Sequence, residues 1–514
     1  MNQPNTFLRR FTRFCGGAAM IMLLLILVPV AVCGLKWTVF ESIYGKYEES
    51  ITFIAHNLPV NLLLTAAALF ALFVCHRLLE RFARVHLDKA LVLLWMAAAL
   101  FWVLGVGLVQ EVDCKDVMDA AKLFARGNYR PMRIAYFSAY PYQLAVCLFE
   151  EAIIRLLPFV DVNLFMQVLN VVCSTCTMGL LCALAQMMFE SRSARIATQV
   201  MAMAFVPMLL YNTYVYGTVP MVFLCTLGFF CFAKYVRDGG LRFLVVCTLA
   251  LGAGYAAKQN ALIPILALAI CSFLHLLNTK DARPLLAMAL ALALGVGLSE
   301  FAVWQYEVRS GMQLGADVSF LARLVMGLQE SETCAGWFNG YTAPFISLDM
   351  TAEAQKEIAS ADLKFRLAEF AADPGMALAF FKDKYLSQWL EPGYSTLWWG
   401  FRCSWTGRFN GLARILYREG GTVRITAEVL MNLYQQALYI LAVVGAAAGV
   451  KRCRNVAVLM IPVTVIGGFL YHMLFEAKSQ YIFVYAVYLL PFAGYGLALT
   501  GEWVVRMIRK MKKA

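Results

Sequence analysis

Residues that could carry out catalysis gather in one polar stretch that lies between two apolar ones. The stretch runs from residue 111 to residue 129 and carries three aspartates, Asp113, Asp116 and Asp119. Five basic residues lie in it or just after it: Lys115, Lys122, Arg126, Arg130 and Arg133. A carboxylate can accept the proton of a hydroxyl, and neighbouring cations can hold a phosphate leaving group. The set therefore suits a reaction between a lipid phosphate and an acceptor hydroxyl at a membrane surface, whereas the plainer interpretation is a group of interfacial charges.

The signatures of common soluble enzymes are absent from the sequence. It contains no Walker loop, no Gly-rich dinucleotide turn after a strand, no HExxH and no GxSxG motif. Of its five histidines, only His56 and His472 are predicted on the same side as the aspartates, which argues against an all-histidine metal site. No metal ligands and no cofactor are assigned, and the use of a divalent metal stays open.

The composition is that of a membrane protein. Hydrophobic residues make up 61% of the chain and charged residues 15%, and the mean hydropathy is +0.68. Soluble domains average about a quarter charged residues. Apolar runs of roughly 20 residues recur along the whole length, and a span in lipid must satisfy its own backbone, so helices are expected. We predict an all-α polytopic membrane protein.

The net charge of +12 does not indicate a nucleic-acid partner. Lysines and arginines cluster in short loops and near both ends, as the positive-inside rule requires, and no nucleic-acid motif accompanies them. The bilayer is the expected partner.

The apolar runs predict twelve spans with both termini in the cytoplasm and the aspartate stretch outside. The first run is predicted to be a retained helix, although it resembles a signal peptide. The run 140–157 is short and contains Glu150 and Glu151, so it is predicted to be a helix at the membrane interface. The predicted spans are 16–35, 57–75, 89–110, 163–189, 196–210, 219–233, 243–257, 262–277, 285–304, 427–450, 457–475 and 482–500.

Three parts of the chain follow from this topology. Residues 1–304 form a predicted transmembrane catalytic module, whose first large outer loop covers 111–160. Residues 305–426 form a predicted extracytoplasmic lid domain, with an amphipathic helix over 362–381 that breaks at Asp373-Pro374-Gly375. Residues 427–514 form the C-terminal transmembrane helices. The tryptophans Trp398 and Trp399 of the lid are either interfacial anchors or substrate contacts.

The aspartate stretch, "VDCKDVMDAAKLFARGNY" with "AYPYQLA" after it, resembles the first outer loop of the GT-C glycosyltransferases. These membrane enzymes use polyprenyl-phosphate sugars. The resemblance is to bacterial family 39-like members, relatives of protein O-mannosyltransferases and of the lipid A aminoarabinose transferase. Three more segments resemble the family in the expected order: "YNTYVYGTVPMVFL" (211–224), "GAGYAAKQNALI" (252–263) and "FEAKSQYIFVYAVYLLPFAGYGL" (475–497).

The resemblance implies roles for individual residues. It makes Asp113 the catalytic carboxylate that activates the acceptor, with Asp116 as the rival for that role. The plainer interpretation of Asp113 is a cap on the helix that follows. Lys258 and Lys478 resemble the outer-face cations that hold the donor phosphate, although each could instead be a snorkelling lysine.

Further residues complete the predicted site. Lys115 and Arg130 are assigned to the donor phosphate. The predicted substrate pocket contains Tyr140, His472, Glu476, Gln480 and Tyr481. His472 and Glu476 have the i, i+4 spacing that places side chains on one helix face, and Glu476 is expected to hold either Lys478 or a sugar hydroxyl.

Two features depart from the family. Relatives carry an Arg-Tyr pair where this chain has Gln480-Tyr481. Protein mannosyltransferases carry an Asp-Glu pair where this chain has Asp113 alone.

The predicted function is transfer of a sugar from a polyprenyl-phosphate donor to a cell-envelope acceptor at the outer face of the cell membrane. The acceptor is a polysaccharide, teichoic acid, glycolipid or protein. Two alternatives remain: a transporter or flippase of lipid-linked saccharides, and a surface-polysaccharide polymerase or ligase that uses a diphosphate-linked donor. A transporter normally shows repeated halves and charged or broken helices at the bilayer midplane, whereas the polar residues here concentrate at one face.

Overall fold

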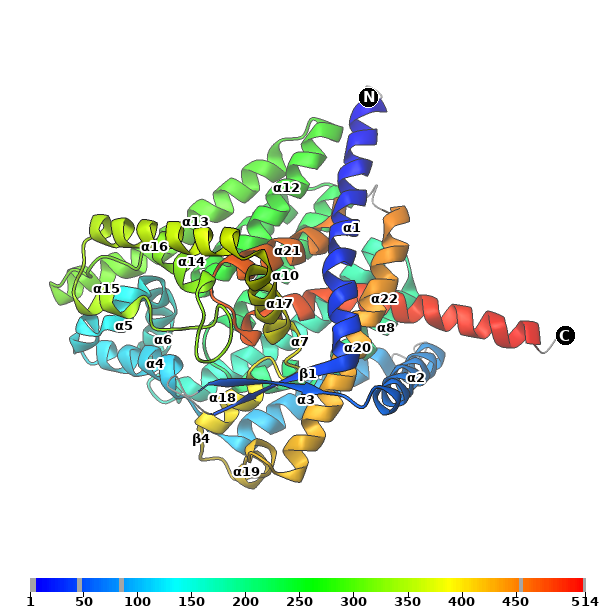
Figure 1. The fold of residues 1–514 in the computed structure, drawn as a ribbon, viewed down its shortest axis with the longest axis horizontal. Helices are drawn as coiled ribbons and strands as arrows, with labels where there is room; N and C mark the ends of the chain where they lie inside the picture. The colour runs from blue at the N-terminus through cyan, green and yellow to red at the C-terminus, as the bar shows by residue number, and fades with distance from the viewer. Residues whose placement is uncertain (1–5, 44–48, 83–86, 453–455, 512–514) are drawn as a thin grey trace.

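The chain folds into a bundle of helices with two short two-stranded sheets (Figure 1). The structure is a computed structural model and describes residues 6–43, 49–82, 87–452 and 456–511. The predicted fold class, an all-α polytopic membrane protein, is confirmed. In the described residues, ten helices are long and apolar enough to cross a membrane. They are α1 (Thr6–Lys36), α2 (Leu58–Phe82), α3 (Leu87–Val106), α7 (Val162–Phe189), α10 (Thr218–Asp238), α12 (Leu262–Thr279), α13 (Arg283–Ser310), α20 (Thr422–Gly449), α21 (Val456–Leu474) and α22 (Ser479–Met511).

Two predicted spans differ from this set. The span predicted at 196–210 is broken into α8 (Arg192–Ala204) and α9 (Val206–Leu210), which meet at an angle of 63°. Pro207 in the first turn of α9 accounts for the break, because proline has no N–H to continue the hydrogen bonds of α8 and its ring clashes with the preceding turn. The helix α11 (Leu241–Ala257) has 17 residues and is short for a span. The predicted count of twelve is reached only if both of these cross the membrane.

The last long helix, α22, forms the centre of the bundle. It packs against α20, α8 and α7, and its apolar part is almost wholly buried. Glycines let α20 and α22 approach closely: a Cβ at Gly445 would lie 2.0 Å from the Phe492 carbonyl oxygen, and one at Gly496 would lie 2.0 Å from the Leu441 carbonyl oxygen. Small residues at such contacts are typical of helix pairs in membranes.

The predicted interface elements form a separate layer beside the bundle. The helix α4 (Val112–Ala125) buries a stripe that contains Val117, Ala120, Ala121 and Phe124, and Gly127 follows it with a φ of +75°. The helix α6 (Leu144–Leu156) has only 13 residues and packs on α4 and α13. Between them lie the short helices η2 (Arg130–Arg133), α5 (Ala135–Ala139) and η3 (Pro141–Gln143). The run 140–157 is therefore too short to span, as predicted.

The polar region after α13 is also helical. It contains α14 (Phe320–Leu328), α15 (Ala343–Ser347), α16 (Ala352–Ala372), α17 (Pro374–Trp389), α18 (Thr396–Arg402) and α19 (Asn410–Tyr417). The predicted break at Asp373 is confirmed, because Asp373 caps α17 by accepting a hydrogen bond from the Met376 amide at 2.9 Å. Lys384 of α17 joins this region to the bundle, since its buried amine donates to the Gly327 and Phe475 carbonyl oxygens.

A β-hairpin follows the first span, where only an outer loop was predicted. The strands β1 (Trp37–Ser42) and β2 (Ser50–Ala55) pair antiparallel, with Glu41 opposite Ile51. A second, smaller pair, β3 (Leu108–Val109) with β4 (Ser404–Trp405), joins the end of α3 to the region after α18. The two pairs bring residues far apart in sequence to the same end of the bundle.

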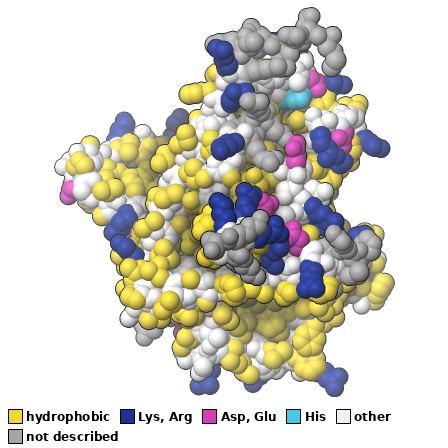
Figure 2. Space-filling view, turned by 90° about the vertical axis from the view of Figure 1, so that its right-hand side faces the viewer, with side chains coloured by type: hydrophobic (Ala, Val, Ile, Leu, Met, Phe, Trp, Pro, Cys, Tyr) yellow, Lys and Arg dark blue, Asp and Glu magenta, His cyan; other side chains and the backbone are white. Residues whose placement is uncertain are grey.

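The α4–α6 layer and the ends of α1 and α22 lie at different sides of the molecule. In Figure 1 the elements α4, α5, α6, α15 and α18 lie at the left and lower left, whereas α1 begins at the top and α22 ends at the right. Figure 2 looks at that right-hand side and shows Lys and Arg side chains gathered near its middle, beside broad apolar areas. The exposed basic residues in the last turns of α22 are Arg506, Arg509 and Lys510. The chain ends themselves, predicted in the cytoplasm, lie outside the described residues.

Candidate active site

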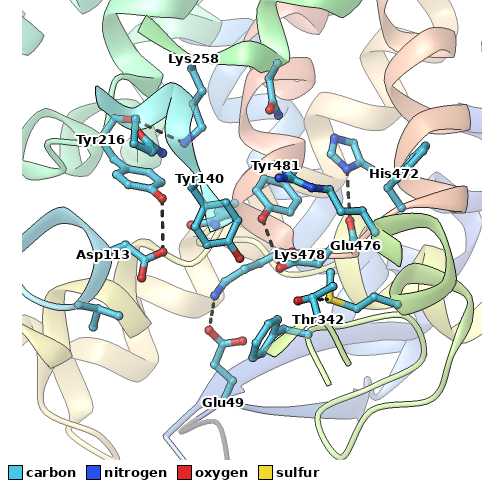
Figure 3. A pocket seen from close by; sticks show the side chains of 18 of the residues that line it. Glu49, Asp113, Tyr140, Tyr216, Lys258, Thr342, His472, Glu476, Lys478 and Tyr481 are labelled. Carbon is cyan, nitrogen blue, oxygen red and sulfur yellow. Dashed lines mark hydrogen bonds and ion pairs between the residues drawn. The ribbon is translucent and has the colours of Figure 1, made fainter. Parts of the chain in front are cut away.

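A pocket of about 470 Å³ lies at the end of the bundle where α4, α14, α18 and the start of α22 meet (Figure 3). Its walls come from segments that are far apart in the sequence. Its polar and aromatic lining includes Glu49, Asp113, Tyr140, Tyr142, Tyr214, Tyr216, Lys258, Arg323, Trp398, Trp399, Arg402, His472, Glu476, Lys478, Gln480 and Tyr481. Pockets that bind small molecules combine aromatic walls with a few converging polar groups in this way.

Asp113 supplies a carboxylate to the pocket from the first turn of α4. Its Oδ2 accepts a hydrogen bond from the Tyr216 hydroxyl at 3.3 Å, and that hydroxyl lies 2.7 Å from the hydroxyl of Tyr136. Burial raises the pKa of Asp113, while Lys478, the Tyr216 hydrogen bond and Lys258 oppose the rise. A carboxylate with a raised pKa is the type of group that serves as a general base.

The backbone before Asp113 is strained. Val112 lines the pocket and has a φ of +54°, which a β-branched residue rarely adopts. Strain of this kind persists only where the surrounding structure imposes it, and it is concentrated at functional sites. The entry into α4 is therefore fixed in a geometry that directs Asp113 into the pocket.

Lys478 supplies the first cation, from the loop between α21 and α22. It forms an ion pair with Glu49, and the side chains of the two residues are only 12% and 9% exposed. Its Nζ also lies 4.5 Å from the centre of the Trp398 ring, a cation–π contact. Burial lowers the pKa of Lys478, but the opposing effects, led by the charge of Glu49, outweigh burial and raise that pKa. Lys478 is therefore a charged ammonium held between an acid and an aromatic ring.

Lys258 supplies the second cation, from the position that directly follows α11. Its Nζ lies 3.5 Å from the Tyr216 carbonyl oxygen and 4.1 Å from the centre of the Tyr216 ring. Burial lowers the pKa of Lys258 to about 8, while Cys114 and Asp113 oppose the shift. Among the described residues no carboxylate forms an ion pair with Lys258, so its amine is available to an anionic ligand.

Two further buried carboxyl groups, those of Glu41 and Glu391, stabilise the segment around Lys478. Glu41 of β1 is buried and accepts a hydrogen bond from the Ser479 hydroxyl at 3.3 Å, and that hydroxyl lies 2.7 Å from the hydroxyl of Ser395. Glu391 accepts hydrogen bonds from the backbone amides of Gly393 at 2.7 Å and Ser395 at 2.6 Å. Burial raises the pKa of Glu41 to about 8 and that of Glu391 to about 7. This network fixes both Ser479 and the turn from which α18 presents its tryptophans.

Aromatic rings line much of the remaining wall. The rings of Tyr214 and Trp399 meet edge to face with centres 4.8 Å apart. Arg323 lies over the ring of Tyr140 at 5.7 Å and pairs with Asp317 at 2.7 Å. The wall thus offers flat apolar surfaces beside charged groups, an arrangement suited to a sugar with a charged attachment.

The structure brings most of the predicted site residues together. Eight of them line this one pocket: Asp113, Tyr140, Lys258, His472, Glu476, Lys478, Gln480 and Tyr481. Three do not. Asp116 and Arg130 are exposed, and Lys115 is exposed, pairs with Glu111 at 3.1 Å and lines a separate cavity of about 340 Å³. Lys115 and Arg130 were expected to bind the donor phosphate, but both lie outside the lining of the pocket.

The predicted arrangement of His472 and Glu476 needs correction. They do not share a helix face, because α21 ends at Leu474 and Glu476 lies in the loop beyond it. Instead the His472 Nδ1 lies 3.4 Å from the Glu476 backbone oxygen. Glu476 does not hold Lys478 either: its carboxylate accepts a hydrogen bond from Tyr481 at 3.3 Å, and burial raises its pKa to about 7. His472 is thus mainly a structural residue, while Glu476 keeps a carboxyl group in the pocket.

The remaining predicted pocket residue, Gln480, also has a positioning role. Its side-chain oxygen accepts a hydrogen bond from Tyr214 at 3.3 Å, and its backbone oxygen accepts one from Tyr211 at 3.4 Å. These bonds tie the start of α22 to the turn η4 (Tyr211–Thr213).

Sequence reasoning missed several residues of the pocket. Glu49 was not singled out because it lies in a segment that showed no pattern beyond that of an outer loop. Arg323 and Arg402 were also missed, since nothing in their neighbourhood indicates which residues face the pocket, and Tyr142 was missed although it lies in the family-like segment "AYPYQLA". Tyr216 lies within the family-like segment 211–224, which could have drawn attention to it. Among the described residues, no three His, Cys, Asp or Glu side chains form a group that could hold a metal ion.

A comparison with protein families gives a match. The model of a family described as "conserved hypothetical integral membrane protein" matches residues 18–313. The matched part contains Glu49, Asp113 and Lys258, and Lys478 lies beyond it. No curated protein matches the chain.

Proposed function

The chain belongs to a family of conserved hypothetical integral membrane proteins, and from the chemistry of its pocket we propose that it is a membrane glycosyltransferase. The donor is a sugar linked to a polyprenyl phosphate, and the acceptor is a hydroxyl of a cell-envelope polysaccharide, teichoic acid, glycolipid or protein. The reaction takes place on the extracytoplasmic face of the cell membrane. The resemblance of the sequence to the GT-C glycosyltransferases is part of the support for this proposal.

One observation carries the proposal: a carboxylate and two lysines share one pocket, yet neither lysine is paired with that carboxylate. Asp113 is bonded to Tyr216, Lys478 to Glu49, and Lys258 to the Tyr216 carbonyl. If Asp113 were neutralised by a lysine, it would be a weak base and the lysine a weak phosphate ligand. The arrangement leaves a proton acceptor beside Lys258, which has no acidic partner among the described residues, and beside Lys478, which is paired with Glu49 rather than with Asp113. A base and cations placed in this way suit sugar transfer from a lipid phosphate.

The chemistry assigned to these groups is a single displacement. The acceptor oxygen attacks the anomeric carbon of the sugar, and the bond from that carbon to the phosphate oxygen breaks. The electron pair of that bond leaves with the polyprenyl phosphate. Asp113 takes the proton of the acceptor hydroxyl, and Lys478 and Lys258 stabilise the charge that develops on the phosphate.

The location of the pocket supports the proposed side of the membrane. The pocket is lined in part by α4 and α18, which lie at the left and lower left of Figure 1, whereas α22, whose last turns carry exposed basic residues, ends at the right. Basic residues favour the cytoplasmic side. We accordingly propose that the pocket opens to the outside, where lipid-linked sugars meet envelope acceptors.

Membranes that contain the protein test the proposal most simply. They are supplied with radiolabelled polyprenyl-phosphate sugars, one donor at a time, and label is followed into products that separate from the donor lipid by chromatography, in both the lipid extract and the residue. We expect one donor to give transfer that depends on the protein and is lost in Asp113→Asn. Absence of transfer from every polyprenyl-phosphate sugar, with transfer from a diphosphate-linked saccharide, would support the polymerase or ligase alternative instead.

A further inference from the structure

We propose that Glu49 is the resident counterion of Lys478. The Glu49 carboxylate pairs with the Lys478 ammonium group until a lipid phosphate binds there. After the transfer, the negative charge of Glu49 repels the product phosphate and favours its release. The inference rests on the proposed function and adds to it a residue that tunes the same site.

The contacts of Glu49 allow its side chain to leave the lysine while its backbone stays in place. Glu49 directly precedes β2, and its backbone oxygen accepts a hydrogen bond from the Thr333 hydroxyl at 3.3 Å. Its carboxylate lines the pocket and pairs with Lys478 (Figure 3). A phosphate that binds Lys478 must take the place of this carboxylate, because both seek the same ammonium group.

The other acids of the pocket are held by other partners. Asp113 accepts a hydrogen bond from Tyr216, and Glu476 accepts one from Tyr481. Glu41, which is buried outside the pocket lining, accepts one from Ser479. Among the described residues, Glu49 is therefore the acid that competes directly with a phosphate for Lys478. Lys258 forms no ion pair with a described acid, so it can receive the phosphate before the exchange takes place.

The charges of donor and product explain what this exchange achieves. The donor is a phosphodiester with one negative charge. When the sugar leaves, the phosphate keeps the electron pair of the broken bond and becomes a monoester, whose second ionisation lies near pH 6. At pH 7 the product therefore carries up to one more negative charge than the donor. A nearby carboxylate repels the added charge, so Glu49 disfavours the product more than the donor.

Direct binding measurements test the inference without any transfer reaction. The protein in lipid nanodiscs is titrated with a polyprenyl phosphate monoester and with the methyl diester of the same lipid, at pH 7.5. We expect Glu49→Gln to bind the monoester at least about tenfold more tightly than the wild type, with a much smaller gain for the diester. Glu330→Gln is the matched control, because it removes an exposed carboxylate that pairs with Arg366 at 3.5 Å outside the pocket.

A second variant shows whether the effect acts through the lysine. Replacing Lys478 by alanine in the Glu49→Gln background should abolish the gain in monoester affinity, since the two residues form one coupled pair. In transfer assays Glu49→Gln should lower kcat through slower product release.

Two results would overturn the inference. Monoester affinity that is unchanged or weaker in Glu49→Gln, while the wild type binds both lipids, would refute the counterion role and leave the proposed function standing. An equal gain for monoester and diester would refute the discrimination by charge. Failure of the wild type to bind either lipid would instead count against the proposed function itself.

Discussion

Replacing Asp113 by asparagine is the substitution that tests the role of the pocket carboxylate. The change keeps the shape of the side chain and removes its ability to take a proton. The amide oxygen of the introduced asparagine would still accept a hydrogen bond from Tyr216, whose hydroxyl lies 3.3 Å from the Oδ2 of Asp113. We expect kcat to fall by roughly 100-fold or more, the usual scale for loss of a general base, while KM for the donor changes little because Lys478 and Lys258 remain.

The pH dependence gives a second readout for Asp113. Burial raises the pKa of Asp113 above its ordinary value, so the base form is lost as pH falls through this raised pKa. The wild-type rate should show an acid limb above the ordinary range for aspartate, and the residual rate of Asp113→Asn should lack it.

The Tm of Asp113→Asn shows whether a loss of activity comes from a loss of catalysis or from a loss of folding. A raised pKa means that the folded protein binds this proton more tightly than the unfolded chain does. The group therefore contributes stability below the unfolded pKa of about 3.9, and this contribution is lost as pH rises through the folded pKa. At neutral pH the charged carboxylate costs stability, so Asp113→Asn should have a Tm equal to or above that of the wild type.

The assay compares Asp113→Asn with Asp116→Asn in proteoliposomes, with the transfer rate and Tm measured on the same preparations. Asp116 is exposed and lies outside the pocket lining, so its variant should keep most of the activity. Normal turnover in Asp113→Asn together with a loss in Asp116→Asn would show that the base was assigned to the wrong aspartate.

Three further predictions follow from other parts of the structure. Lys478→Ala removes a charge-assisted contact worth about 1.5–3 kcal/mol, so the KM for the donor should rise roughly 10- to 100-fold with little change for the acceptor; equal changes in both would demote Lys478 to a structural role. Lys384→Met leaves two buried carbonyl groups without their donor and should lower the free energy of unfolding by about 2 kcal/mol or more, whereas Lys382→Met, at an exposed neighbour, should not. Impermeant thiol reagents should label a cysteine introduced at Glu369 from outside intact cells and should not label one at Arg195; the reverse pattern would invert the topology.

The sequence was a good guide to the fold because the membrane imposes one dominant pattern. Apolar runs long enough to cross lipid mark the membrane helices directly, and the polar segment Asp373-Pro374-Gly375 marks the break between α16 and α17. The errors have two causes. The bend between α8 and α9 follows from Pro207, a local signal inside an apolar run that was long enough for one span. The position of the β-hairpin depends on partners distant in the sequence, such as Ser479, which donates a hydrogen bond to Glu41.

The candidate site was predictable in part for a related reason. Asp113, Lys258 and Lys478 each follow or precede an apolar run, so their depth and side could be inferred, and all three line one pocket. The partners of these residues could not be inferred. Glu49 is 429 positions from Lys478, and only the folded hairpin shows that it, rather than Glu476, pairs with the lysine.

The fate of the donor lipid tests the central claim most directly. Purified protein in proteoliposomes is given a doubly labelled polyprenyl-phosphate sugar together with an envelope extract as the acceptor source, and both labels are quantified after separation of the lipids. The glycosyltransferase account predicts that free polyprenyl phosphate accumulates in a one-to-one ratio with transferred sugar, and that Asp113→Asn suppresses both. Movement of the intact donor across the bilayer with no cleavage of its sugar–phosphate bond would contradict the account and identify a lipid-linked saccharide flippase.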